Sequence, residues 1–221
     1  MFVIIESSCQ KNGENNNPNN PIETGNLTDI DGNVYKTIKI GSQWWMAENL
    51  KVTKYRNGDP IPNVTVNVSW AALTSGAYCW YNNDATTNKV TYGGLYNWYA
   101  VIDKRIIAPT GWHIPTLAEF TTLVNYLGGA VGGKLKETGS THWASPNTGA
   151  TNESGYTALP GGLRGINGKF YSILEFGYWW STSEFNANNA HSSHYLYSTG
   201  SNSSGGNYQK YYGFSVRCIK D

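Results

Sequence analysis

The sequence predicts a turn-rich, partly β globule with few helices, and three features of its composition indicate this class. Glycine, which turns favour, is abundant, with 25 residues among 221. Aromatic residues make up 14% of the chain, including 9 Trp and 16 Tyr, and such side chains bury large apolar areas. Leu, Ala, Glu and Lys do not dominate, which argues against a helical bundle.

Length and charge exclude several classes of protein. A chain of 221 residues forms one large domain or two small ones and can bury a sizeable core. Sixteen basic side chains against fifteen acidic ones give a net charge of +1, which argues against a nucleic-acid binder. No apolar run approaches the ~18 residues of a membrane span. With few ionisable groups, the composition favours binding over acid–base catalysis.

The first 26 residues differ in composition from the rest of the chain. Residues 1–5 are apolar, Ser-Ser-Cys9 follows shortly after, and an Asn/Pro-rich stretch without an apolar face comes next. An apolar run before Ser-Ser-Cys resembles the end of a bacterial lipoprotein signal, with Cys9 as the lipidated residue. We predict a signal remnant and flexible tether over residues 1–26 and one domain over residues 27–221. The alternative is a cytosolic N-terminus with an incidental cysteine.

Local patterns predict the elements of the first half of the domain. Asp31-Gly32 separates two apolar stretches and predicts a hairpin that leads into a strand over residues 34–40. Residues 43–50 are aromatic and lack Gly and Pro, which favours a short helix or a wide turn. Residues 55–64 contain two prolines and predict a loop. Residues 78–84 predict a strand followed by an Asn-Asn-Asp turn.

The second half contains the strongest helix signal of the chain. Residues 117–127 place their apolar side chains on one face, Thr116 and Glu119 form a capping-box pattern, and Gly128 ends the helix. The spacing of four apolar or aromatic residues between positions 92 and 99 predicts a second, short helix. The remaining predictions are long ordered loops over residues 130–170 and buried strands over residues 177–180 and 213–219.

Several strings of residues, spread over the whole domain, together resemble one family. These strings are residues 29–35, 45–50, 78–84, 95–101, 109–115, 133–139, 158–162, 179–184 and 213–218. In this order they resemble the Fibrobacter succinogenes major paralogous domain, found in surface and secreted proteins of Bacteroidetes and Fibrobacteres. That family is similar, more distantly, to C-type-lectin-like and formylglycine-generating-enzyme-like folds. The resemblance implies an α+β, C-type-lectin-like fold with few short helices, small antiparallel sheets and long ordered loops, and no established activity.

One position departs from the pattern of that family. The family usually has a Cys before its Pro-Thr-Gly-Trp string, placed to bridge to the Cys near the C-terminus, and this chain has Ala108 there. The resemblance therefore implies that Cys218 lacks its usual partner. The residues alone leave two alternatives, a bridge between Cys79 and Cys218 or two free buried thiols.

The sequence contains no catalytic or metal-binding motif, and we expect neither an enzyme nor a cofactor. His191 and His194 have no Cys or Glu at the spacing of a zinc site. His113 is expected to be a buried, hydrogen-bonded structural residue. The formylglycine-generating relatives use a pair of C-terminal cysteines, of which only Cys218 is present. Calcium remains possible, because the oxygens of Asn82-Asn83-Asp84 suit a turn or a hard cation.

Residues 181–212 form the predicted binding region. The segment is rich in Ser, Asn and Tyr and carries a single acid, Glu184, and a single base, Lys210. This is the composition of recognition loops, and aromatic rings beside amides and hydroxyls also suit sugar rings. Adjacent strand residues point to opposite faces, so one of Trp179 and Trp180 is expected to be exposed. The candidate contacts are Tyr195, Tyr197, Tyr208, Tyr211, Asn186, Asn188, Asn189, Asn207 and Trp180.

These observations predict a non-catalytic cell-surface or secreted binding domain that recognises a polysaccharide or a partner protein. Membrane attachment is expected only through a lipid on Cys9, at the outer membrane or cell surface. Three alternatives remain: a structural subunit of a surface filament or outer-membrane assembly, a polysaccharide-active hydrolase, and a retroelement-diversified ligand-binding protein. A polar surface loop without a partner is a further interpretation of residues 181–212. The ligand and the oligomeric state are left open.

Overall fold

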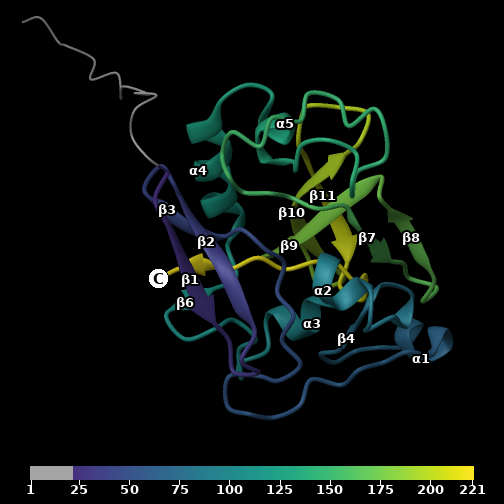
Figure 1. Cartoon of the computed structure of the whole chain (residues 1–221). Coiled ribbons are helices and arrows are strands. Elements are labelled where there is room, and N and C mark those ends of the chain that lie inside the picture. Colours follow the sequence, from purple (N-terminus) through teal and green to yellow (C-terminus); the bar gives the residue numbers. More distant parts are fainter. Residues whose placement is uncertain (1–21) are drawn as a thin grey trace, which may run out of the picture.

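The computed structural model describes residues 22–221, without the side chains of residues 191–195, and two five-stranded sheets form its framework (Figure 1). The first sheet has the order β1 (Thr24–Thr28), β2 (Val34–Ile40), β3 (Gln43–Met46), β12 (Ile219–Lys220) and β6 (Trp112–His113). The second has the order β11 (Ser204–Gln209), β10 (Asn189–Tyr197), β9 (Phe176–Glu184), β7 (Gly161–Arg164) and β8 (Phe170–Ile173). The strands of each sheet pair antiparallel, except β7 with β9. A ribbon of β4 (Tyr78–Cys79) and β5 (Leu95–Tyr96) lies beside them.

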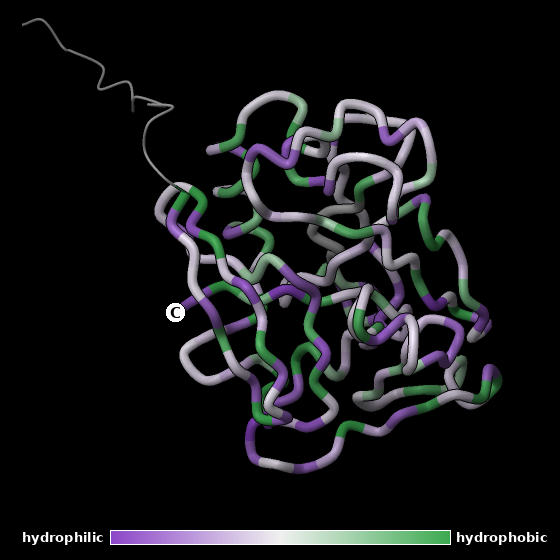
Figure 2. The backbone as a smooth tube through the Cα atoms, in the orientation of Figure 1, coloured by the Kyte–Doolittle hydropathy of each residue, from purple (hydrophilic) through white to green (hydrophobic). Residues whose placement is uncertain are grey.

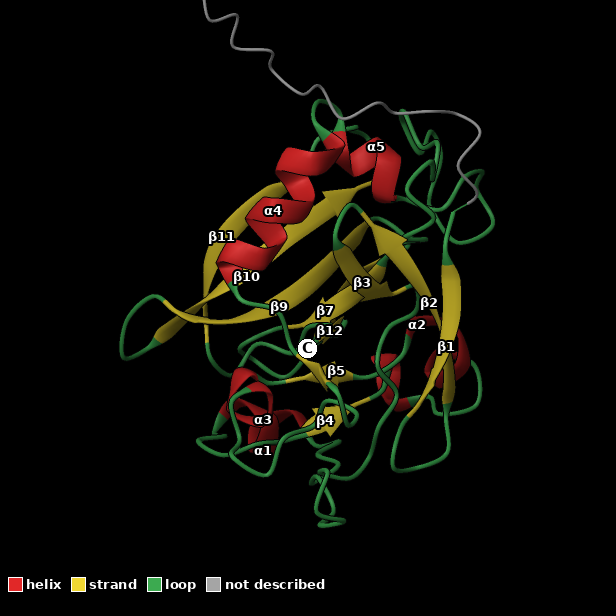
Figure 3. Ribbon diagram, turned by 90° about the vertical axis from the view of Figure 1, so that its left-hand side faces the viewer, coloured by secondary structure: helices red, strands yellow, loops and turns green. Residues whose placement is uncertain are grey.

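Helices are few and short, so the chain has the mixed α+β class that the family resemblance implied. They are α1 (Asn67–Ala71), the 3₁₀ turn η1 (Tyr81–Asn83), α2 (Asn88–Tyr92), α3 (Trp98–Val101), α4 (Leu117–Leu127) and α5 (Val131–Leu135). None of the helices in the described part is long and apolar enough to cross a membrane. In Figure 3, α4 lies across β9 and β10 and covers one face of the second sheet.

The elements with strong local signals form as predicted. Helix α4 has its capping box: the Thr116 hydroxyl accepts from the Glu119 backbone N–H, and the Glu119 carboxylate accepts from the Thr116 N–H at 2.7 Å. Gly128 ends the helix with φ of +70°. Strand β2 spans the predicted residues, and hydrophilic and hydrophobic residues are mixed along β1 and β2 in Figure 2. Burial alternates over the first four residues of β2, from Val34 to Thr37.

Two predictions are wrong: the short helix or wide turn over residues 43–50, and the short helix over residues 92–99. Residues 43–46 form β3, because Trp44 and Trp45 pair with Lys39 and Ile38 of β2 and so alternate between faces. The segment 92–99 is divided, because Gly93 adopts φ of +73° and ends α2. The chain then continues as β5 and α3, and α3 begins at a new cap.

The predicted loops and C-terminal strand are correct only in part. The stretch 130–170 contains α5 and β7 as well as loops. Residues 213–218 are extended but join their neighbours through isolated bridges, such as Phe214 with Tyr96 and Ser215 with Trp179, and only Ile219–Lys220 form a strand.

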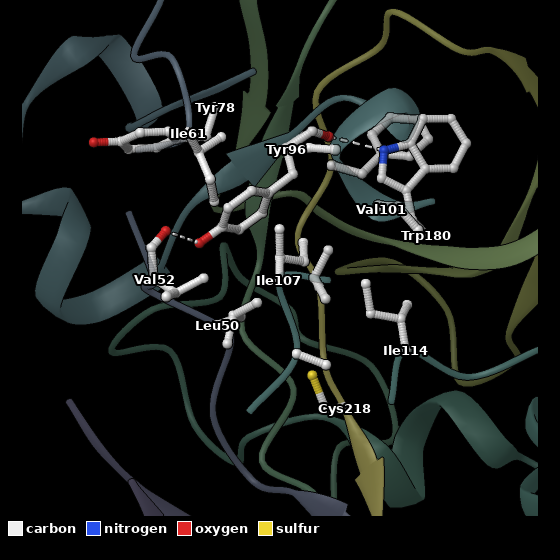
Figure 4. Close-up of a cluster of buried hydrophobic side chains, with 14 of the residues drawn as sticks. Leu50, Val52, Ile61, Tyr78, Tyr96, Val101, Ile107, Ile114, Trp180 and Cys218 are labelled. Atoms are coloured by element: carbon white, nitrogen blue, oxygen red, sulfur yellow. Dashed lines mark hydrogen bonds between the residues drawn. The ribbon is translucent and has the colours of Figure 1, made fainter. Parts of the chain in front are cut away.

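The core lies on both faces of β9, which corrects the prediction for the tryptophan pair. Trp179 packs with Trp45 and Tyr156 in one cluster, and Trp180 packs with Phe214 in the other. The two side chains do point to opposite faces, but both faces are covered, so neither is exposed. Figure 4 shows part of the second cluster, where the Trp180 indole N–H donates to the Tyr96 carbonyl.

Buried cations hold the long loops together through backbone carbonyls. The Lys136 ammonium donates to the carbonyls of Thr148, Tyr197 and Gly200 at 2.9–3.1 Å, and burial lowers the pKa of this side chain to about 8. Arg164 and Arg217 are also fully buried and donate chiefly to carbonyls of distant loops. Each cation thus donates hydrogen bonds to backbone carbonyl groups that the regular pairing of helices and sheets does not satisfy.

Candidate binding surface

Aromatic side chains from separate segments gather on one face of the second sheet. We call this group the tyrosine platform: Phe176 and Tyr178 of β9, Tyr197 of β10, Tyr208 of β11 and Tyr212. Phe176 and Tyr178 stack with ring centroids 5.9 Å apart, and Tyr178 contacts Tyr208 edge-on at 6.0 Å. Tyr208 in turn contacts Tyr212 at 5.4 Å. All but the buried Tyr178 are half-buried, so the rings form a surface continuous with the core.

Strand alternation and one buried phenylalanine explain why these rings meet. Phe176, Tyr178 and Trp180 are two residues apart on β9 and share a face. Phe214 lies beneath the platform, stacked on Tyr178 at 5.0 Å, and it also contacts the rings of Tyr208 and Tyr212. Because Phe214 is fully buried, the platform rests on a rigid base.

The platform contains no charged side chain, and the two charged residues of the 181–212 segment, Lys210 and Glu184, are paired with each other. The Lys210 ammonium is buried and donates to the Glu184 carboxylate and to the Ala187 carbonyl, above the ring of Trp98. The single base of the segment is therefore neutralised by its single acid. Burial, with the neighbouring hydroxyls of Tyr211 and Tyr171, raises the pKa of Tyr212. Neutral phenols are thus the polar groups that the platform offers at physiological pH.

The structure divides the predicted contact residues among different places. Tyr197 and Tyr208 belong to the platform. Tyr211 is half-buried, and its hydroxyl donates to Gln209 at 2.8 Å. Asn207 is exposed and, by strand alternation, faces away from Tyr208. The side chain of Tyr195 lies outside the described part of the chain.

Three predicted asparagines form the turn between β9 and β10. Asn186 and Asn188 are exposed and Asn189 is half-buried. The side-chain oxygen of Asn186 accepts from the backbone N–H groups of Asn188 and Asn189 at 3.0 and 2.9 Å, so it shapes the turn. In Figure 3 this hairpin extends beyond the body of the second sheet.

Trp180 is wrong as a ligand contact, and three platform residues were missed. Trp180 is fully buried because α3 and β5 cover its end of β9, so no ligand reaches it. Phe176, Tyr178 and Tyr212 were not predicted. The period-2 pattern of Phe176, Tyr178 and Trp180 is a signal that could have found the first two.

The two described cysteines and the oxygens of the predicted Asn-Asn-Asp turn have structural roles. Cys79 and Cys218 are both free and buried, which decides between the two alternatives for this pair, and burial raises the pKa of Cys79 to about 12. Cys9 lies outside the described residues. Asp84 accepts from the backbone N–H groups of Thr86 and Thr87, the turn role expected of it. Among the described side chains, no cluster of three or more metal-ligating residues occurs.

His113 is hydrogen-bonded as predicted, but it is not buried. Its side chain is 40% exposed, with Nε2 at 2.8 Å from Glu119 and Nδ1 at 2.7 Å from Asp221. A neutral imidazole has one N–H, so two carboxylate partners favour the doubly protonated ring. Partial burial alone would lower the pKa of His113, but the hydrogen bonds to Asp221 and Glu119 outweigh it and raise the pKa.

We expect this cluster to make stability depend on pH. Because the folded pKa of His113 is above its unfolded value of 6.5, its contribution is complete below pH 6.5 and disappears as the pH rises through the folded pKa. The free energy of unfolding, measured in urea, should fall by up to about 1 kcal/mol between pH 5.5 and pH 9. The fall is no larger because solvent screens these partly exposed charges. His113→Gln should remove that part of the slope. An unchanged slope in the variant would contradict this role.

Comparison with known proteins identifies the family. Residues 38–220 match the model of the Fibrobacter succinogenes major domain. No curated protein and no solved structure matches the chain, so the C-type-lectin-like part of the fold expectation stays a prediction. Because the family model covers most of the chain, the protein belongs to the Fibrobacter succinogenes major domain family.

Proposed function

We propose that this domain is a non-catalytic binding module, displayed on the cell surface or secreted, and that its tyrosine platform binds a neutral polysaccharide. The observation that carries the proposal is the platform itself. Half-buried aromatic rings from β9, β10, β11 and the following segment meet on one face, fixed from below by Phe214.

The chemistry of the platform favours a neutral, hydroxylated ligand. Aromatic rings contact the C–H faces of sugar rings, and phenol hydroxyls both donate and accept hydrogen bonds. With Lys210 held by Glu184, this base is not available to select an anionic partner. A partner protein contacted by the same rings is the other interpretation, and binding assays separate the two.

One observation favours a second candidate, a structural subunit of a surface assembly. Strand β11 is an edge of the second sheet, and its residues Ser204–Gln209 contain two glycines and no charge or proline. Such an edge lacks the usual protection against pairing with another strand. Light scattering after size-exclusion chromatography tests this candidate, because a monomer at high concentration would contradict it. The hydrolase and the retroelement-diversified protein remain predictions from the sequence.

Replacing a platform ring is expected to weaken glycan binding without unfolding the protein. The purified chain would be screened on an array of neutral glycans, and the strongest binder titrated by calorimetry. Tyr197→Ala should weaken binding roughly tenfold or more, because losing one aromatic contact costs about 1–2 kcal/mol. Tyr126 of α4, which is 48% exposed, provides a matched control as Tyr126→Ala.

Two results would contradict this assignment. If Tyr197→Ala binds the glycan as tightly as the unchanged protein, the platform is not the binding site. Loss of binding accompanied by a large fall in Tm would show that Tyr197 acts through stability. If no neutral glycan binds but a surface protein does, the polysaccharide assignment fails and the platform remains a protein-binding surface.

A further inference from the structure

We infer that the protein has a second binding site, in a hollow beside α3, and that this site binds one hexose unit through two neighbouring hydroxyls. The inference extends the proposed function, because it places the same class of ligand at a separate location. The hollow has a volume of about 340 Å³, at the lower end of small-ligand pockets. It is lined by Pro60, Pro62, Thr74, Ser75, Gly76, Tyr99, Ile102, Asp103 and Arg105.

An ion pair supplies the polar groups of this hollow. Arg105 donates to both oxygens of Asp103, through Nε at 2.9 Å and Nη2 at 2.7 Å. The Arg105 hydrogen bonds hold the pKa of Asp103 down at about 2, so the carboxylate is charged at all physiological pH values. The guanidinium also lies 3.9 Å from the centroid of the Tyr55 ring. Carboxylate and guanidinium are therefore fixed before a ligand arrives.

The buried ring of Tyr55 supports the ion pair from behind the hollow. Tyr55 is fully buried, and its hydroxyl lies beside the Asp103 carboxylate and the Arg105 guanidinium. It lies directly behind Gly76, where a Cβ atom would be 2.4 Å from the hydroxyl oxygen. Burial and the charge of Asp103 raise the pKa of Tyr55 to about 12, so the hydroxyl keeps its proton.

The charges favour a neutral polyol over other ligands. Arg105 is shared between Asp103 and Asp59, 3.4 Å from its Nη1, so the group has a net charge of −1 and disfavours phosphates and carboxylates. Both Asp103 oxygens already hold the guanidinium, which disfavours a metal ion. Adjacent acceptor and donor groups instead match two neighbouring hydroxyls of a sugar. The ring of Tyr99 and the exposed side chain of Ile102 offer apolar surface to its C–H face.

Nuclear magnetic resonance titration of the full chain would test this site. The probes are the methyl glycosides of glucose, galactose and mannose, added to the ¹⁵N-labelled protein. We expect at least one of them to shift the amide signals of residues 75–76 and 99–105, with a Kd of about 1–10 mM, as befits a single small ring. Asp103→Asn should weaken this binding about tenfold or more.

Matched variants separate this inference from the platform proposal. Glu153→Gln removes an exposed carboxylate elsewhere and should leave the shifts unchanged. Tyr197→Ala disrupts the platform and should also leave the amide shifts unchanged. The two proposals can therefore be refuted independently of each other. If Asp103→Asn does not fold, Tyr99→Leu removes the ring contact and should weaken binding. The absence of shifts with all three probes at 100 mM, or shifts that survive both Asp103→Asn and Tyr99→Leu, would overturn the inference.

Discussion

Replacing Arg217 by Met is expected to lower the free energy of unfolding by about 3–5 kcal/mol, the range for breaking a buried charged network. The guanidinium is 1% exposed. It donates to the Asn49 side chain at 2.9 Å and to the carbonyls of Tyr156 and Thr157, and it lies 4.2 Å from the Tyr156 ring centroid. Met keeps most of the apolar stem but leaves these acceptors without their donor.

The loss follows from the nature of these partners. Burial lowers the pKa of Arg217 to about 10, which shows that the charge itself is costly to bury. An apolar residue can replace a buried ion pair when both partners change together, but backbone carbonyls cannot be changed. The acceptors at Tyr156 and Thr157 would therefore stay buried and unpaired.

Urea unfolding followed by tryptophan fluorescence measures this effect, and two variants separate charge from geometry. Arg217→Lys keeps the charge but not the fork of donors, so we expect an intermediate loss. Lys39→Met removes a half-buried cation whose partner, Glu23, is exposed, and should cost less than about 1 kcal/mol. If Arg217→Met lowers the free energy of unfolding by less than about 1 kcal/mol, the loops around residue 156 do not depend on the Arg217 guanidinium.

This role of Arg217 also shows what could not be predicted from the sequence. Helix α4 and strand β2 were predictable because their signals are local: a capping box, an apolar face, a glycine end and an Asp-Gly turn. The partners of Lys136, Arg164 and Arg217 are mostly carbonyls of distant loops, and a carbonyl is present in every residue. No spacing of residue types identifies such an acceptor.

The errors have the same origin in tertiary contacts. Residues 43–46 form a strand because β2 and β12 lie on either side of them, and the two tryptophans suit a strand, a signal that the prediction did not use. Trp180 alternates with Trp179 as predicted, yet the covering of both faces by other segments decides its burial. Tyr197 and Tyr208 of the platform lie within residues 181–212, the segment whose composition predicts a binding region. Phe176 and Tyr178 precede that segment and join it only through the pairing of β9 with β10.

The second large effect is a gain in stability, expected when Ala108 is replaced by Cys. Ala108 and Cys218 are 2% and 0% exposed and belong to the same buried cluster. Figure 4 shows the Cys218 sulfur pointing toward Ile107, the neighbour of Ala108. The family resemblance implies a bridge between these two positions, and Arg56 already fixes the chain there by donating to the Ala108 carbonyl.

A bridge between residues 108 and 218 would close a loop of about half the chain and restrict the unfolded state. The expected gain is about 2–4 kcal/mol, which for a domain of this size raises Tm by about 5–15 °C under oxidising conditions. Thiol titration in denaturant should find two fewer free thiols than in the reduced variant. Ala108→Ser provides a control of similar volume without a bridge. Dithiothreitol should lower the Tm of the Ala108→Cys variant to the Tm of Ala108→Ser. If the variant keeps both thiols free in air, the two side chains do not meet in bonding geometry, and the departure at Ala108 reflects a local rearrangement of the chain rather than the loss of one sulfur.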